Sequence, residues 1–408
     1  MEVLHPRCAG LDIHAKTLTA CVRLTAGAAV THELRTFAMT TRGLLALQDW
    51  LTASGCTHVA LEATGVYWKP VWHLLAEAVT LVLANAQHIR QVPGRKSDAH
   101  DATWIADLLA HGLIRSSFVP PPAIQELREL TRTRKQLVHE IARHTLRLQK
   151  ILETANVKLT EVVSDVLGVS SRAILTALIH GETDPERLAD LTQGRLKASR
   201  ATLVEALHGH VTAHHRFMLD LHLTQIDALE TAIARLEAQV ESTMAPFRAA
   251  VAHLLTMPGV SVTVARVLVA EIGIDMSRFP TAGHLVSWAG LCPRLDESAG
   301  KRRSTRLRHA TPWLKATLVQ AAWAASRTNG SYLQAQFLRL RARRGPKKAI
   351  VAVAASMLTA AYFMLRDGVD YRDLGGRYLA ERDKQRTTRH LLRRLRELGV
   401  EVEVRTAA

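Results

Sequence analysis

The apolar positions of the first 120 residues follow two different periods. Apolar and β-branched residues recur with period two, or as short apolar runs, in LDIHAKTLTACVRL, AVTHELRTFAM, THVALEA and VTLVLANA. This pattern predicts strands. The segments TTRGLLALQDWLTAS and VYWKPVWHLLAEA between them have helical spacing. Three strands in succession, followed by alternating strand and helix, predict a mixed α/β sheet of the ribonuclease H type.

Acidic residues lie at one edge of this predicted sheet. Asp12 is on the first, central strand, and Glu62 ends a neighbouring one. A helix starting near Ser97 carries Asp98 and Asp101 at spacing i, i+3. Hard divalent cations prefer oxygen ligands, and two of them about 3.5–4 Å apart can clamp the attacking and leaving oxygens of a phosphodiester. The four carboxylates therefore predict a magnesium site, with Mn²⁺ as the alternative ion, and phosphoryl transfer on nucleic acid.

The pattern changes to helices after residue 120. Pro120, Pro121 and Pro122 predict a stiff linker. Shorter helices are expected over residues 156–210, with ETDPER as a turn and helix start. Two heptad seams predict long helices that pair either with each other or with a second protomer as a coiled coil. The seams are Leu127, Leu130, Arg134, Leu137, Ile141, His144, Leu148 and Ile151, and then Leu219, His222, Ile226, Leu229, Ile233, Leu236 and Val240.

The last third predicts further helices. LLTMPGVSVTVARVLVAEIG is typical of two helices joined by a Pro-Gly turn, a helix-hairpin-helix pattern whose turn amides can face a phosphate backbone. The apolar segment from Ala349 to Leu365 is at the short limit for a bilayer and contains Ser356 and Thr359, so we expect a buried core helix and no membrane partner. The expected divisions are 1–120, 121–247 and 248–408.

Charge indicates the partner. The chain has 53 Lys+Arg against 37 Asp+Glu, a net charge of +16, which favours a polyanion such as nucleic acid. Three quarters of that surplus lies between Arg294 and Ile350, where 14 Lys+Arg face two acidic residues. The four cysteines are far apart without a CxxC pair, so we expect free thiols in a reducing cytoplasm. The N-terminus lacks the pattern of a signal peptide.

Several motifs together resemble a known family. They are GLDIHAK, LEATGVYW, NAQHIRQVPGRKSDAHDATWIADLL, the MPGV turn with AEIG, and RFPTAGHLVSWAGLCPRLDESAGKRR. Across nearly the whole chain the sequence is similar to the insertion-sequence family 110 transposases, including the 1111 subgroup, which are DEDD transposases also described as bridge-RNA-guided DNA recombinases.

The resemblance implies a RuvC-like N-terminal domain whose DEDD carboxylates, Asp12, Glu62, Asp98 and Asp101, bind magnesium. It implies a nucleophilic serine in the C-terminal transposase domain, at Ser298, within a dimer or tetramer assembled through the coiled coil. It also implies an element-encoded structured RNA that pairs with target and donor DNA. The scissile backbone is expected on the basic residues Lys301, Arg302, Arg303, Arg306 and Arg308. The place of action would be the bacterial cytoplasm, on the nucleoid when bound to DNA.

Some residues leave alternatives open. Spacing alone does not choose among Ser298, Ser304 and Thr305 as the nucleophile. A RuvC-like nuclease that uses water, as in a junction resolvase, is the rival function. The chain also departs from the family, with Ala310-Thr311-Pro312 in place of a Gly-Asn pair and with Ser261 in place of a second turn glycine. His14 and His100, which flank the acids, are interpreted as solvated neighbours, and Asp107 as a surface residue.

Overall fold

The structure is a computed structural model that describes residues 2–27, 29–63, 65–84, 101–193, 198–293, 296–304, 306–307, 312–382 and 384–400. It separates into two compact units, Met1–Val119 and Pro120–Ala408. Each unit is described by itself.

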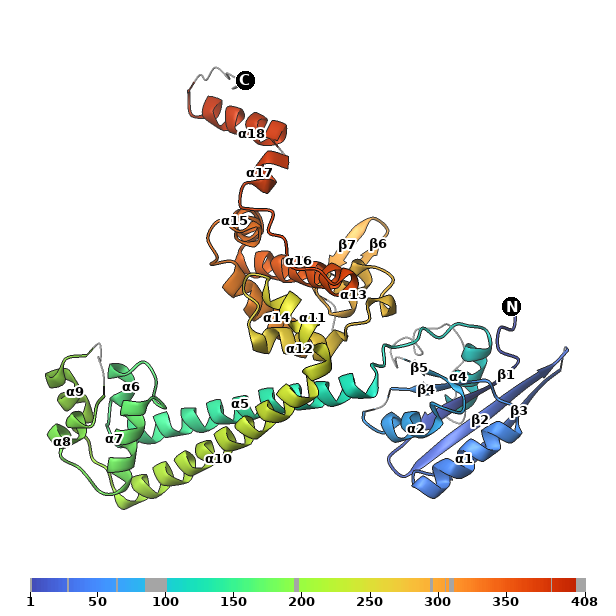
Figure 1. Cartoon of the computed structure of the whole chain (residues 1–408), viewed down its shortest axis with the longest axis horizontal. Coiled ribbons are helices and arrows are strands. Elements are labelled where there is room, and N and C mark those ends of the chain that lie inside the picture. Colours follow the sequence, from blue (N-terminus) through green and yellow to red (C-terminus); the bar gives the residue numbers. More distant parts are fainter. Residues whose placement is uncertain are drawn as a thin grey trace. The chain divides into compact units, whose positions relative to one another are not determined.

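The first unit is built on a mixed five-stranded sheet (Figure 1). Its strand order is β3-β2-β1-β4-β5, so β1 is central. The strands are β1 (Arg7–Ile13), β2 (Thr17–Ala26), β3 (Ala29–Ala38), β4 (His58–Glu62) and β5 (Thr80–Ala84). The first three are antiparallel neighbours, and β1, β4 and β5 are parallel. This mixed sheet followed by a helical remainder is consistent with the expected ribonuclease H-like start.

Helices cover the two faces of the sheet. On one face, α1 (Thr41–Ala53) and α2 (Trp68–Leu75) bury Leu47, Leu51 and Leu75 against alternate residues of the strands. On the other face lies α4 (Asp101–Ala110), whose Ile105, Leu108 and Leu109 are buried. Thr40 begins α1 because its side chain accepts a hydrogen bond from the Gly43 amide.

Two long helices form the first part of the second unit. They are α5 (Pro122–Thr154) and α10 (Ala213–Thr243), and they run antiparallel side by side within one chain (Figure 1). Arg134 near the start of α5 bonds to Glu237 near the end of α10. Within this chain, therefore, the two seams pair as a helical hairpin. Proline suits the first turn of α5, because its missing N–H would have no helical partner there.

A cluster of short helices closes the far end of this hairpin. The helices α6 (Leu159–Val162), α7 (Val169–Ile179), α8 (Pro185–Asp190) and α9 (Arg200–Leu207) bury a continuous apolar core with both long helices. The predicted helix start in ETDPER is confirmed, since Asp184 caps α8 and accepts a hydrogen bond from the Glu186 amide.

The remaining elements include one apolar helix, α16 (Pro346–Asp367). The other described elements are η2 (Ala245–Phe247), α11 (Arg248–Leu255), α12 (Val262–Ile272), η3 (Met276–Arg278), α13 (Ala282–Trp288), the hairpin of β6 (Asp296–Ser298) and β7 (Lys301–Ser304), α14 (Pro312–Ala325) and α15 (Tyr332–Arg344), followed by α17 (Tyr378–Arg382) and α18 (Lys384–Glu397). Several of these, namely α11, η3, α13, α14 and α15, pack against α16. By length and composition, α16 is the one helix in the described part of the chain that could cross a membrane, but half of its apolar window is buried. The prediction of a core helix agrees with this burial.

Candidate active-site elements and nucleic-acid interface

Asp12 and Glu62 lie on the same face of the sheet. Alternate residues of a strand point to opposite faces, and Leu11 and Leu61 are buried in the core beneath α1 and α2. Their neighbours Asp12 and Glu62 therefore face the other way, toward the side covered by α4. Leu11 and Leu61 are register partners on parallel strands. The two acids that follow them therefore lie side by side at the carboxyl ends of these adjacent strands.

Gly10 brings α4 directly onto this face. A Cβ atom at Gly10 would lie 2.2 Å from the Ala102 carbonyl oxygen and 2.4 Å from the Ala106 amide nitrogen. Only glycine permits this approach of a helix backbone to a strand. Asp101, the first residue of α4, is thereby held near the end of β1 that carries Asp12. Asp12 and Glu62 thus share one face of the sheet, and the helix that begins with Asp101 packs on that same face.

An ion pair between a buried arginine and a partly exposed aspartate, which the sequence did not indicate, fixes α4 further along. Arg23 of β2 is 4% exposed, and its Nε donates to Asp107 Oδ1 at 2.8 Å. His32 Nε2 lies 3.0 Å from the same oxygen. Asp107 thus joins helix to sheet while its side chain stays 36% exposed, so it lies at the surface, as expected, and also has a structural role. Partners 84 residues apart leave no local spacing signal.

Asp12 remains accessible at this edge. Its side chain is 26% exposed, and its Oδ2 lies 3.2 Å from His14 Nε2. His14 itself is 66% exposed, so it is a solvated neighbour that also contacts the acid. The tautomer of His14 that carries its proton on Nε2 can donate one hydrogen bond to this carboxylate.

The donor chemistry of these residues fits a hard divalent cation, since all of the oxygens are carboxylate oxygens. Asp98 and His100 lie outside the described residues. Among the residues that the structure does describe, no three His, Cys, Asp or Glu side chains gather closely enough to hold a metal ion. The described part of the site therefore has the ligand type and the shared edge, with one predicted ligand still to be placed.

Ser298 is the last residue of β6, in the second unit. It pairs with Lys301 across a two-residue turn formed by Ala299 and Gly300. Both turn residues have positive φ, 50° at Ala299 and 72° at Gly300, as a type I′ turn requires. Glycine adopts this conformation freely, but for alanine it costs roughly 1–2 kcal/mol. The predicted nucleophile thus directly precedes a strained residue.

The predicted basic residues fall around this hairpin. Lys301 is an exposed residue of β7, and Arg306 is exposed two residues after that strand ends. The backbone of Arg302 and Arg303 belongs to β7, and Arg308 lies outside the described residues. The rival nucleophile Ser304 accepts a hydrogen bond from the Arg306 amide. Thr305 lies outside the described residues.

The MPGV turn joins α11 to α12 and packs on α14. A Cβ at Gly259, where φ is 81°, would lie 2.4 Å from the Ala321 carbonyl oxygen, so this position requires glycine. Ser261 stands where the family has a second turn glycine. It caps α12, because its Oγ accepts a hydrogen bond from the Val264 amide. Pro312 begins α14, where proline is acceptable.

The AEIG motif contains a buried acid that joins α12 to α5. Glu271 is 1% exposed, and both of its oxygens accept hydrogen bonds from Arg132, each at 2.7 Å. Arg128 donates to the Glu271 backbone oxygen at 2.6 Å. Burial lowers the pKa of Arg128 to about 10, although the Glu271 charge opposes that shift. Sequence reasoning identified AEIG as a motif without assigning its acid a role.

Two family models match this chain. One, described as a transposase and named for the DEDD proteins of IS110, matches residues 9–157. The other, described as "Transposase IS116/IS110/IS902 family", matches residues 251–338. The first match spans Asp12, Glu62, Asp98 and Asp101, and the second spans Ser298 and the basic hairpin.

Curated relatives agree with these matches. "Insertion element IS110 uncharacterized 43.6 kDa protein" of Streptomyces coelicolor is 29% identical, over 68% of this chain and 73% of that protein. "Probable family 20 transposase" of Pseudomonas aeruginosa is 26% identical, over 72% of this chain and 79% of that protein. "Insertion element IS900 uncharacterized 42 kDa protein" of Mycobacterium paratuberculosis is 27% identical, over 72% and 80%.

Proposed function

The chain belongs to the IS110 family of transposases, enzymes that act on DNA, and we propose that it cleaves and rejoins DNA strands through a covalent phosphoserine at Ser298. The observation that supports the proposal is that Asp12 and Glu62 share the face of the sheet on which α4 packs, held there by its close approach to Gly10. Donor and target DNA are the substrates of the proposed reaction.

Asp12, Glu62, Asp98 and Asp101 would hold magnesium, with manganese as the alternative. When bound, the ion would lower the pKa of a coordinated hydroxyl and offset charge that develops on the transferring phosphoryl group. Asp12 and Glu62 lie on strands and Asp101 begins a helix, so regular secondary structure positions three of the proposed ligands.

Ser298 would perform the exchange of bonds. Its oxygen attacks the phosphorus, one P–O bond to serine forms, and the P–O bond to the departing deoxyribose oxygen breaks. The departing oxygen takes up a proton while the serine proton passes to solvent. The phosphoserine conserves the bond energy, so a deoxyribose hydroxyl can later attack it and rejoin the strand. Lys301, Arg302, Arg303, Arg306 and Arg308 would hold the backbone meanwhile.

Assembly completes the proposed site. The acids belong to Met1–Val119 and Ser298 belongs to Pro120–Ala408, so a working centre needs both units at one phosphodiester. We propose that a homo-oligomer, a dimer or tetramer, brings them together on DNA. An element-encoded structured RNA would select target and donor sequences. Sequencing of copurified small RNA tests the guide, and absence of any enriched structured RNA would remove it from the proposal.

The serine is tested by trapping its covalent adduct. Wild-type protein and Mg²⁺ should yield a protein–DNA band on a denaturing gel, and the phosphopeptide should map to Ser298. Ser298→Ala should abolish both the adduct and strand transfer. Ser304→Ala is the matched control, because Ser304 lies in the same hairpin and should leave the adduct intact. Normal cleavage by Ser298→Ala would instead favour the RuvC-like nuclease that uses water.

The acids are tested separately. Asp12→Asn keeps the shape of the side chain and its hydrogen-bonding capacity but removes its charge, so it should eliminate Mg²⁺-dependent adduct formation. Unchanged metal-dependent activity in that variant would dismiss the metal site.

A further inference from the structure

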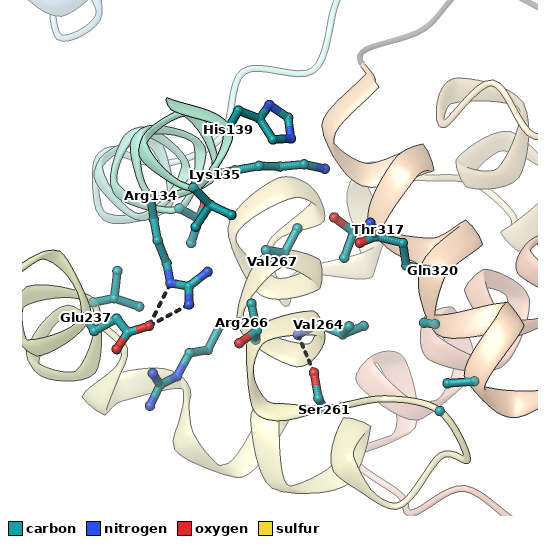
Figure 2. Close-up of a pocket in the computed structure, with 17 residues that line it drawn as sticks. Arg134, Lys135, His139, Glu237, Ser261, Val264, Arg266, Val267, Thr317 and Gln320 are labelled. Carbon is teal, nitrogen blue, oxygen red and sulfur yellow. Dashed lines mark hydrogen bonds and ion pairs between the residues drawn. The ribbon is translucent and has the colours of Figure 1, made fainter. Parts of the chain in front are cut away.

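A cavity of about 440 Å³ lies where four segments of the second unit meet. Its walls come from α5, the end of α10, the MPGV turn with the start of α12, and α14 (Figure 2). The volume falls in the range of small-ligand sites, roughly 300–1,000 Å³. Its lining, among the described residues, contains none of the proposed catalytic residues. It is therefore a separate feature of the molecule.

The interior of the cavity is mostly apolar. Short valine and alanine side chains line it, among them Val138, Val267 and Ala324. Two polar groups of α14 join them, the Thr317 hydroxyl and the Gln320 amide (Figure 2). Thr317 donates to the Trp313 carbonyl oxygen at 2.9 Å, and its oxygen can still accept. Apolar walls with a few orienting polar groups suit a flat heteroaromatic ring.

Cations also line the cavity, but they are not equivalent. Arg134 is paired with Glu237 and Arg266 with Glu241. Lys135 extends from α5 toward Thr317 and Gln320 (Figure 2), and its Nζ lies 5.9 Å from the centre of the Trp313 ring. Burial lowers the pKa of Lys135, while the Glu271 charge opposes the shift. A partly desolvated ammonium beside an apolar cavity favours an anion attached to a ring.

We propose that this cavity accepts one unstacked base of the bound DNA, with Lys135 against the adjoining phosphate. The inference rests on the proposed function in taking DNA as the occupant. A paired base must first be extruded from the duplex, and that step is cheapest where the nucleotide is already unpaired. The protein should therefore prefer DNA with an unpaired base. An apolar side chain of another protein would fill the cavity but bring no anion to Lys135.

The test compares two short DNA duplexes of the same sequence, one fully paired and one with a single unpaired adenine. Full-length protein should bind the bulged duplex about tenfold more tightly, which corresponds to about 1.4 kcal/mol of binding free energy. Ala324→Trp fills the cavity from an exposed position, so it should abolish the preference while keeping the affinity for paired DNA. Ala228→Trp, at an exposed position of α10 outside the cavity, should retain the preference.

Two polar variants refine the test. For the bulged duplex, Lys135→Gln should make the slope of log affinity against log salt concentration less steep by about 0.9, the value for one phosphate contact. The slope for the paired duplex should not change. Gln320→Leu preserves the size of the cavity and should reduce the preference only in part. Thermal melting of each variant confirms that it is folded.

Equal wild-type affinity for the two duplexes would overturn the proposal, as would a preference that survives in Ala324→Trp. A preference seen only with a bulged RNA would reject DNA as the occupant. The serine-adduct assay separates this inference from the proposed function. Adduct formation without any bulge preference removes the cavity proposal alone, whereas a cavity-dependent preference without an adduct removes the serine chemistry alone.

Discussion

Gly10→Ala should damage both the fold and the chemistry of the first unit. The added Cβ would lie 2.2 Å from the Ala102 oxygen, 2.4 Å from the Ala106 nitrogen and 2.9 Å from the Ile105 Cβ, whereas real Cβ contacts essentially never fall below 3.0 Å. Two of the three atoms belong to helix backbone, so α4 must move by nearly 1 Å. Overpacking costs about 1–3 kcal/mol, and contacts this close predict the upper value.

The movement has a catalytic consequence because Ala102 directly follows Asp101. A shift of α4 away from β1 carries Asp101 away from Asp12 and Glu62. We expect Mg²⁺-dependent adduct formation per folded molecule to fall at least tenfold, which corresponds to about 1.4 kcal/mol. Raising the Mg²⁺ concentration should recover part of the loss, since weaker ligand geometry lowers affinity for the ion.

Gly43→Ala is the matched control. Its Cβ would also lie 2.2 Å from a backbone oxygen, that of Ala38, but Gly43 belongs to α1, on the opposite face of the sheet. Both variants should destabilise the unit, and only Gly10→Ala should lose activity per folded molecule. Hydrogen exchange measured by mass spectrometry should show loosening of α4 in one variant and of α1 in the other. Wild-type activity together with unchanged protection of α4 in Gly10→Ala would refute the reasoning.

Three further predictions concern the second unit. Glu271→Ala leaves the guanidinium of Arg132 without its partner and should lower the free energy of unfolding by about 3 kcal/mol; a denaturant midpoint equal to wild type would contradict this. Burial, then the charges of His144 and Arg147, lower the pKa of His222 from 6.5, so the folded state favours the neutral ring. The stability that this provides is complete above about pH 6.5. It is lost as the pH falls from there to the lowered pKa of the folded state. His222→Gln should flatten the slope of stability against pH, and an unchanged slope would count against the assignment. Ala299→Gly relieves a positive φ and should stabilise the hairpin by up to about 1 kcal/mol, seen as slower amide exchange in Lys301–Ser304; faster exchange would exclude the strain.

Local periodicity predicted most of the elements of the first unit. Period-two alternation indicated the strands, and the same alternation placed Asp12 and Glu62 at one edge. Periodicity did not predict how α4 packs on the sheet. That depends on the missing Cβ at Gly10 and on Arg23 bonded to Asp107, and a residue 84 positions away has no fixed spacing.

The helical hairpin shows a different limit. Heptad seams predict which residues of a helix are buried. They are equally compatible with a partner helix in the same chain and with one in another chain. The structure distinguishes the two through cross-helix contacts, Arg134 with Glu237 and His144 with His222. Arg134, His144 and His222 are polar positions of the predicted seams, where hydrogen bonding restricts the register that apolar residues leave open. Pairing within the chain leaves oligomerisation to other surfaces or to the outer faces of the same helices.

The choice of Ser298 over its neighbours came from the family motif, and the structure adds a physical reason to test it first. Ser304 already accepts a backbone hydrogen bond within the hairpin, whereas Ser298 precedes a turn in which alanine adopts a left-handed conformation. Strain of this kind persists only where surrounding structure enforces it, and it is concentrated at functional sites. The acids, by contrast, end strands of a packed sheet. If the proposed metal site in one unit and the proposed nucleophile in the other are both required, neither unit should cleave DNA alone. That division suits an enzyme that must not cut DNA before its partner strands are assembled.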